Sequence, residues 1–147
     1  MAYLIGEYRQ KVDAKGRLAV PASFRKVLPD ELFVVNAPSM NPDEKCLYVF
    51  EKEDFDRWVE SFFEKFGGFN QNNPQHVAIR RTLNSKAQLT TIDGSGRITI
   101  PLKQREEVEL DKDVAVIGNT GYFEIWDAKR WDEQKMSDED LASLLFG

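Results

Sequence analysis

The sequence predicts an α+β fold in which two related halves close one β-barrel, with helices at its flanks. Three observations lead to this prediction: a motif that returns eighty positions later, short alternating strands bounded by turn residues, and an aromatic stripe at helical spacing. Each half alone offers about four short strands and a helix, which is little material for a core. We therefore expect one intramolecular pseudo-twofold unit rather than two independent domains.

The repeat is the strongest of these observations. Residues 13–21, DAKGRLAVP, return as residues 93–101, DGSGRITIP, with Asp, Gly, Arg and Pro in the same relative places. At the same offset Arg25 matches Arg105 and Leu28 matches Val108. Matching segments follow in the same order, with the drift in offset absorbed by loops: 32–36 with 114–118, and 47–51 with 123–127. The chain thus divides into one half at 5–53, a helical connection at 54–83, a second half at 84–128, and a C-terminal helix and tail at 129–147.

Each motif has the composition of a turn between two strands. Asp at the first position and Gly at the fourth suit a type I turn closed by a left-handed residue, as in a β-hairpin with a bulge. Pro21 ends the second strand and begins a short helix, and Pro101 repeats this step. The predicted strands are 7–12, 17–20, 32–36 and 47–50, then 88–92, 97–100, 114–118 and 122–126. The last two strands of each half form a further hairpin.

Residues 53–66 predict the clearest helix. Its apolar residues fall on one continuous stripe: Phe55, Trp58, Val59, Phe62, Phe63 and Phe66. The loop 69–74 is the best candidate for a linker between the halves, and a weaker helix follows at 75–83. The second half repeats the helix at 127–136, and Ser137 begins a capping signature before the apolar tail, which either docks or frays.

The charge is distributed in phase with the repeat. The net charge is −5, yet residues 9–26 and 76–105 each hold six basic residues against one acid, while the intervening and final segments are acidic. If both motifs share a face, that face is basic and the remainder is acidic. The single cysteine, Cys46, excludes an internal disulfide and fits a reducing compartment. The first twenty residues are too charged for a secretory signal, and no apolar run reaches membrane length, so we expect a cytoplasmic protein.

Asp-x-x-Gly-Arg has both a structural and a functional interpretation. In the structural one, Asp satisfies turn amides, Gly takes positive φ, and Arg is exposed or pairs with the Asp. A turn does not, however, need Arg after its Gly. Arg is the side chain that forms bidentate hydrogen bonds with phosphate or with the edge of guanine. We therefore predict that the turns present Arg17 and Arg97 to DNA, with Lys15 at the first tip and the Asp orienting each Arg.

The tandem motifs resemble the MraZ family of bacterial regulators, which are built from two SpoVT-AbrB-type swapped-hairpin domains. The resemblance covers most of residues 4–135, including the opening LIGEYR, both motifs, both prolines and the segment EIWD at 124–127. It implies a double-split β-barrel, sequence-specific binding to repeated promoter elements of the division and cell-wall gene cluster, and homo-oligomeric rings. The second motif departs from the family in having Ser95 where Lys or Gln is frequent, so the first turn is expected to contribute more.

The predicted DNA-binding residues come from both turns and the strand before the first: Arg9, Lys11, Asp13, Lys15, Arg17, Asp93 and Arg97. The expected partners are double-stranded DNA and further copies of the chain, at the nucleoid. We expect no cofactor, metal, membrane or small-molecule substrate. The alternative function is an AbrB-like interaction scaffold or antitoxin-type module that binds another protein.

Enzymatic and metal-binding alternatives lack their usual parts. His76 is the only histidine, so neither a hydrolytic triad nor a zinc site can be assembled, and a surface or packing role is expected for it. Cys46 lies in a strand-like segment and is expected in the core rather than as a nucleophile. The segment Gly94-Ser95-Gly96 has no following Lys and does not form a phosphate loop. The carboxylates at 43–56 and 127–140 are interpreted as solvated faces.

Overall fold

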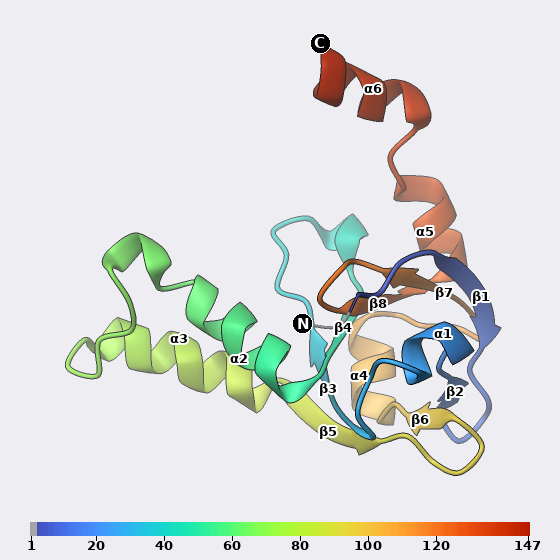
Figure 1. Cartoon of the computed structure of the whole chain (residues 1–147), viewed down its shortest axis with the longest axis horizontal. Coiled ribbons are helices and arrows are strands. Elements are labelled where there is room, and N and C mark those ends of the chain that lie inside the picture. The colour runs from blue at the N-terminus through green and yellow to red at the C-terminus, as the bar shows by residue number, and fades with distance from the viewer. Residues whose placement is uncertain (1–2) are drawn as a thin grey trace.

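In the computed structural model, which describes residues 3–147, two antiparallel sheets are flanked by helices (Figure 1). The strands are β1 (Glu7–Lys11), β2 (Arg17–Ala19), β3 (Glu31–Asn36), β4 (Leu47–Phe50), β5 (Ala87–Thr91), β6 (Arg97–Thr99), β7 (Asp113–Gly118) and β8 (Phe123–Asp127). The helices are α1 (Ala22–Arg25), α2 (Lys52–Ser61), α3 (Pro74–Ser85), α4 (Leu102–Glu107), α5 (Ala128–Gln134) and α6 (Asp138–Phe146), with short 3-10 turns at η1 (Pro42–Glu44) and η2 (Glu64–Phe66). The eight predicted strands are confirmed to within one residue at each end.

Each sheet contains strands of both halves. The larger sheet has the order β1-β7-β8-β4-β3-β5, and the smaller one pairs β2 with β6. The first strand of each half, β1 or β5, therefore pairs with the third strand of the other half, β7 or β3. Neither half completes its own sheet, so the expectation of one intramolecular unit is confirmed.

The register shows how closely the two halves are related. Lys11 faces Asp113, and the equivalent residue Thr91 faces Glu31, so the β1–β7 register is repeated in β5–β3. The β4–β8 pairing is centred on Tyr48 and Glu124, which are equivalent positions. The β2–β6 pairing is likewise centred on two equivalent residues, Leu18 and Ile98. A pseudo-twofold axis therefore passes through both pairs.

One sequence prediction needs correction: the first two strands of each half do not form a hairpin ladder. The Asp13 amide donates to the Arg17 carbonyl over 3.0 Å, which closes the turn, but β1 then pairs with β7 and β2 with β6. The strands diverge because the carbonyl of Gly16 accepts the Ile100 amide of the other half, over 2.8 Å. The carbonyl of Gly96 accepts the Val20 amide in the same way, over 2.9 Å. The turn was predicted correctly, whereas the partner of each arm was not.

Apolar side chains from both halves and both sheets form the main core. Residues that lie opposite each other across the pseudo-twofold, such as Leu18 and Ile98, are fully buried there. A second cluster, rich in aromatic rings, fills the space beneath α2 and α3 and includes Phe50, Phe55 and Phe63. Burial of this shared apolar surface is expected to be the main stabilising contribution, so we expect neither half to be stable alone.

The helical connection forms a hairpin of α2 and α3 that projects from the sheets (Figure 1). The predicted helix at 53–66 stops earlier than expected, because the amides of Phe62 and Phe63 donate to carbonyls three residues back and tighten the last turn. The loop 69–74, predicted as a linker between halves, instead turns the chain within this hairpin. His76 is buried among the rings of Phe63, Phe66 and Phe69, which confirms a packing role for it.

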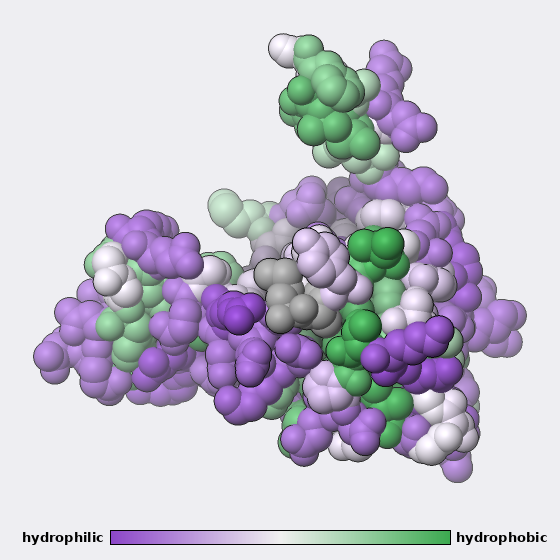
Figure 2. All heavy atoms as spheres, in the orientation of Figure 1, coloured by the Kyte–Doolittle hydropathy of each residue, from purple (hydrophilic) through white to green (hydrophobic). Residues whose placement is uncertain are grey.

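The C-terminal tail forms α6, which stands apart from the sheets (Figure 1). The hydroxyl of Ser137 accepts the Asp140 amide over 3.1 Å, so the capping signature is confirmed. The apolar residues of this helix remain exposed, with Leu144 at 74% and Phe146 at 86%, and Figure 2 shows the helix as a mainly apolar surface. Among the described residues, no helix has both the length and the apolar character needed to cross a bilayer.

Candidate nucleic-acid interface

The first motif folds into a turn that Asp13 holds together. One carboxylate oxygen accepts the backbone N–H of Lys15 over 3.0 Å and that of Arg17 over 2.8 Å. The other oxygen accepts Nε–H of the Arg17 side chain over 2.6 Å. A single Asp thus satisfies two turn amides and orients the following Arg, so both the structural and the orienting roles predicted for it are present.

The second motif repeats this arrangement less tightly. The Asp93 carboxylate accepts the amides of Ser95 over 2.8 Å and of Arg97 over 3.0 Å. Nε of Arg97 lies 3.4 Å from the carboxylate, within ion-pair distance, but this nitrogen has no hydrogen-bond partner among the described residues. The second Arg is therefore held mainly by charge, whereas the first is also held by a short directional bond.

The electrostatics of both turns follow from these contacts. The backbone N–H of Arg17 is the largest influence that lowers the pKa of Asp13 below its ordinary value, and the Arg17 side chain and the Lys15 amide lower it further. The pKa of Asp93 is lowered for the same reason, chiefly by the N–H of Arg97. Both carboxylates are ionised at neutral pH, so each Asp–Arg pair is a fixed dipole rather than an isolated cation.

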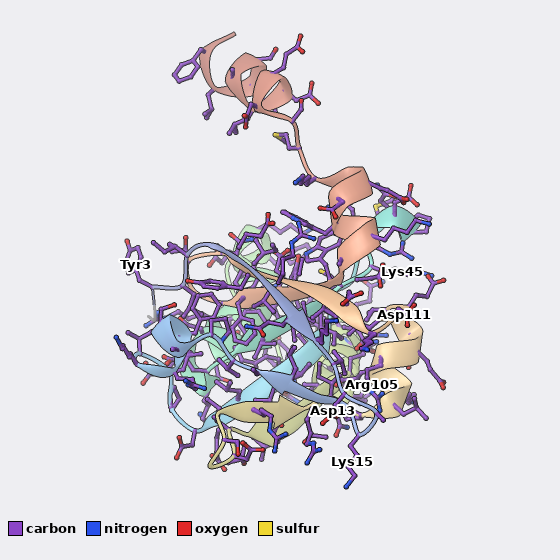
Figure 3. All side chains as sticks on the ribbon, turned by 90° about the vertical axis from the view of Figure 1, so that its right-hand side faces the viewer. Tyr3, Asp13, Lys15, Lys45, Arg105 and Asp111 are labelled. Carbon is purple, nitrogen blue, oxygen red and sulfur yellow. The ribbon has the colours of Figure 1, made fainter. Side chains whose placement is uncertain are left out.

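The two turns lie at opposite ends of the small sheet, because each precedes one of its two antiparallel strands. Because β2 pairs with β6 around Leu18 and Ile98, Arg17 and Arg97 begin neighbouring antiparallel strands on the two sides of the pseudo-twofold axis. Both arginine side chains are about one-third exposed, at 36% and 33%. Lys15 lies at the exposed tip of the first turn and points away from the protein (Figure 3). We call these three cations and the two Asp residues the turn pair.

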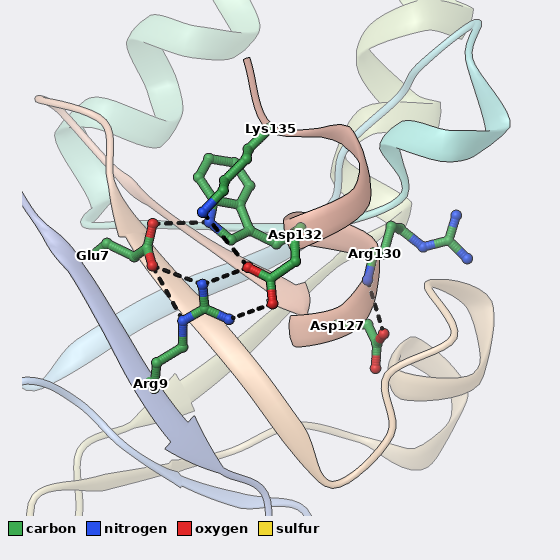
Figure 4. A network of polar contacts seen from close by, with 7 residues as sticks. Glu7, Arg9, Asp127, Arg130, Asp132 and Lys135 are labelled. Atoms are coloured by element: carbon green, nitrogen blue, oxygen red, sulfur yellow. Dashed lines mark hydrogen bonds and ion pairs between the residues drawn. The ribbon is translucent and has the colours of Figure 1, made fainter. Parts of the chain in front are cut away.

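Arg9 and Lys11 are placed differently from the turn pair. The guanidinium of Arg9 lies between β1 and α5, where it donates to the carboxylates of Glu7 over 2.8 Å and of Asp132 over 2.7 Å (Figure 4). Trp131 joins this network by donating Nε1–H to Glu7 over 2.9 Å. Lys11 is exposed at the end of β1, with Nζ 3.9 Å from the carboxylate of Asp113. Arg9 is thus engaged by carboxylates, whereas Lys11 is nearly free.

The sequence reasoning matched Arg25 with Arg105 but did not assign them to the site. In the structure each lies against the turn of the other half, near Gly96 and Gly16 respectively. The one feature of the sequence that could have pointed to these two residues is that they match in the repeat, eighty positions apart. Other members of the basic segments lie elsewhere: Arg80 stacks on the ring of Phe69, with its guanidinium carbon 3.4 Å from the ring centre. The simple charge count therefore overstates how much cation faces the turns.

Residues considered for other chemistries lie in the core. Cys46 is buried at 2% exposure, and burial raises the pKa of its thiol well above the ordinary range, so it is not a nucleophile. Within residues 3–147, no group of three or more His, Cys, Asp or Glu side chains is arranged to hold a metal ion.

Comparison with known proteins places these features in a family. The family model described as "MraZ protein, putative antitoxin-like" matches residues 3–73 and 83–143, so it spans both halves. The chain is 33% identical to the transcriptional regulator MraZ of Mycolicibacterium smegmatis over 139 residues, covering 95% of this chain and 91% of that protein. It is 34% identical to the protein of the same name from Corynebacterium urealyticum, with 94% and 91% covered, and 35% identical to that of Syntrophobacter fumaroxidans, with 94% and 88% covered. The relatives carry the name of a regulator rather than of an enzyme, in agreement with the expectation from sequence. On this likeness over nearly its whole length, the chain belongs to the MraZ family.

Proposed function

We propose that this protein is a transcriptional regulator that binds DNA in a sequence-specific manner through its turn pair. The observation that carries the proposal is the position of Arg17 and Arg97 on neighbouring strands about a pseudo-twofold axis, each oriented by its own Asp. Duplex DNA offers backbone positions related by local twofold symmetry, so two symmetric cationic turns suit it. The names of the relatives, which are transcriptional regulators, support the same function.

The chemistry of the turn pair fits a polyanion that also has readable base edges. An Arg whose Nε is tied to an Asp keeps its terminal NH2 groups for a ligand, and these groups can grip phosphate or the O6 and N7 atoms of guanine. Lys15 adds a mobile charge suited to phosphate. Ser95 lacks that charge, so the first turn contributes more to affinity than the second. Lys11 and Arg9 lie on β1, the strand before the first turn, with the smaller part expected for Arg9 because two carboxylates already bind it.

The finer features follow from the family resemblance and belong to the same proposal. We assign the fold to a double-split β-barrel, an interpretation that the pairing of strands between the halves supports, with the halves at 5–53 and 84–128, the connection at 54–83 and the tail at 129–147. The protein acts in the cytoplasm at the nucleoid, on repeated promoter elements of the division and cell-wall gene cluster. One turn pair makes few contacts, so a homo-oligomeric ring that places several pairs on repeated sites would multiply the affinity.

A DNA titration at fixed salt tests this function. Labelled duplex from the promoter of the division and cell-wall cluster is compared with a scrambled duplex of equal length, using wild-type protein and the variants Arg17→Ala and Arg97→Ala. We expect Arg17→Ala to cost about 1–3 kcal/mol of binding free energy if the Arg reads a base, and to reduce the salt slope by about 0.9 if it binds a phosphate. Lys129→Ala, on α5 at the far end from β2 and β6 (Figure 1), is the control for loss of one charge. Equal wild-type affinity for both duplexes would exclude sequence-specific binding.

A second candidate, binding of another protein, is favoured by the tail. The exposed side chains of Leu144, Leu145 and Phe146 on α6 offer an apolar surface of the kind that a protein partner covers. The family description "putative antitoxin-like" points in the same direction. This candidate requires that Arg17→Ala and Arg97→Ala leave the cellular phenotype intact, so the same variants distinguish the two functions.

A further inference from the structure

Arg105 lies against the first turn, although it belongs to the second half. Nε of Arg105 donates to the carbonyl of Ile100 over 3.0 Å, and the amide of that same Ile100 donates to the carbonyl of Gly16 over 2.8 Å. A methyl group placed on Gly16 would meet Cζ and Nε of Arg105 at 3.0 Å. The guanidinium thus packs over the left-handed glycine that closes the turn, and it fixes the strand to which that glycine is bonded.

Arg25 has the equivalent position at the second turn. Its Nη1 donates to the carbonyl of Gly96 over 3.4 Å, and that carbonyl also accepts the amide of Val20 over 2.9 Å. A methyl group on Gly96 would collide with the guanidinium of Arg25. Each half therefore extends one arginine from its short helix, α1 or α4, to the basic turn of the other half.

We propose that Arg105 and Arg25 are positioning residues that act between the halves, each holding the DNA-contacting turn of the opposite half in its binding geometry. The effect on DNA binding rests on the proposed function. The contact between each Arg and the opposite turn does not, because it lies within the protein. The benefit is preorganisation: a turn held in place loses less conformational freedom when it binds.

The two contacts are unequal. Arg105 is half-buried, lies against a backbone that is itself hydrogen-bonded, and serves the turn that carries Lys15. Arg25 is exposed and makes a longer bond through a terminal nitrogen. Arg105 therefore braces through its Nε–H and the flat face of its guanidinium, which Lys cannot reproduce, whereas a Lys at position 25 can still reach the carbonyl of Gly96.

Amide hydrogen exchange in the full chain without DNA tests the bracing directly. In Arg105→Ala, we expect the amides of Arg17 and Ile100 to exchange about tenfold faster, while those of Arg97 and Val20 keep their rates. Arg25→Ala should give the opposite pattern. Lys103→Ala, which removes an 88% exposed cation from the same helix α4, is the matched control and should change neither set. Acceleration in all four amides, in none, or in the turn of the same half would overturn the inference.

A double-mutant cycle measures the consequence for DNA binding. Combining Arg105→Ala with Arg17→Ala should give a loss smaller than the product of the single losses, by about threefold or more, because both changes disable one turn. Combining Arg105→Ala with Arg97→Ala should give the product. Arg105→Lys should bind as weakly as Arg105→Ala, whereas Arg25→Lys recovers most of the affinity lost in Arg25→Ala. Equal coupling to both turns, or recovery by Arg105→Lys, would make Arg105 a direct charge contact instead. If Arg17→Ala leaves binding unchanged, the proposed function fails, and the exchange rates still decide the bracing.

Discussion

At the scale of single residues, Asp13 closes the first turn and, under the proposed function, also prepares Arg17 for recognition. Asp13 accepts two backbone amides and one Nε–H, so the group that closes the turn also fixes the orientation of the Arg17 guanidinium. An unpaired carboxylate beside DNA would repel phosphate, but here its charge is balanced by the Arg that it orients. In the proposed interface, the repulsion between Asp13 and phosphate is therefore offset, because Asp13 holds the Arg17 guanidinium in one orientation.

The pH dependence of stability follows from the lowered pKa values of Asp13 and Asp93. Because both values are lower in the folded protein, the ionised carboxylates stabilise it fully above the unfolded value of about 4, and this contribution is lost as pH falls through the folded values. Compared with the double variant Asp13→Asn and Asp93→Asn, the wild type should therefore have a higher urea midpoint at neutral pH and lose the difference in acid. Asp138→Asn, on the separate helix α6, is the control. A difference that stays constant with pH would contradict the expectation.

The two turn glycines should not tolerate Ala equally. Gly16 and Gly96 have φ of +82° and +76°, where a Cβ costs about 1–2 kcal/mol. At Gly16 the added carbon also meets the backbone carbonyl of Ile100, which cannot easily move, whereas at Gly96 it meets the flexible side chain of Arg25. We expect Gly16→Ala to lower the free energy of unfolding more than Gly96→Ala does, as measured by urea titration. Gly94→Ala, with no atom within 4 Å of its added carbon, should be near neutral. Equal losses at positions 16 and 96 would mean that the clash with backbone is relieved.

At the scale of elements, local patterns predicted the strands well and their partners poorly. Period-two alternation and the prolines after β2 and β6 fix where strands begin and end, because those signals act between near neighbours. The same local signals favour a hairpin across residues 13–16, yet the carbonyl of Gly16 binds Ile100 of the other half. Signals between near neighbours carry no information about this pairing with a distant strand. The repeat, with its offset of eighty residues, is the one long-range signal in the sequence. It pairs Arg25 with Arg105, but it does not show that each of them lies against the turn of the other half.

The contact between β1 and α5 illustrates an element held by charge. β1 is an edge strand, and the network of Arg9, Glu7, Asp132 and Trp131 holds α5 against it (Figure 4). Because Arg9 is committed to this contact, Arg9→Ala should lower Tm slightly and weaken DNA binding less than Arg17→Ala does. Exposed ion pairs each contribute little, so a large loss of stability is not expected. Lys11→Ala, on the same face of β1, gives the comparison, since it removes a weakly paired cation from which we expect a larger part in DNA binding. If Arg9→Ala weakened DNA binding as much as Arg17→Ala does, Arg9 would have to contact DNA directly.

At the scale of the whole molecule, the pairing of strands between the two halves leads us to expect one cooperative unit. Each first strand depends on the other half for its partner, and the axis passes through the fully buried pair Leu18 and Ile98. The sequence could show that two copies exist, because the offset is visible. It could not show whether the first strand of a half pairs within its own half or with the other half, because both pairings would bury the same apolar residues. Only the geometry of the turns, which send β1 and β2 into different sheets, decides between them.

Cooperativity of this kind can be measured. Leu18→Ala and Ile98→Ala should each lower the free energy of unfolding by about 2–5 kcal/mol, because each leaves a cavity at the shared axis. In either variant both halves should unfold in a single transition, since neither sheet survives loss of the other half. The natural tryptophans allow the test. A variant keeping only Trp58 reports on the helical connection where it packs against β4 of the first half, and one keeping only Trp126 reports on the second half. Coincident urea midpoints for the two probes would support one unit. If Ile98→Ala shifted only the Trp126 midpoint, the halves would be separate domains, and the coupling that Arg25 and Arg105 provide between the turns would have no rigid frame to act through.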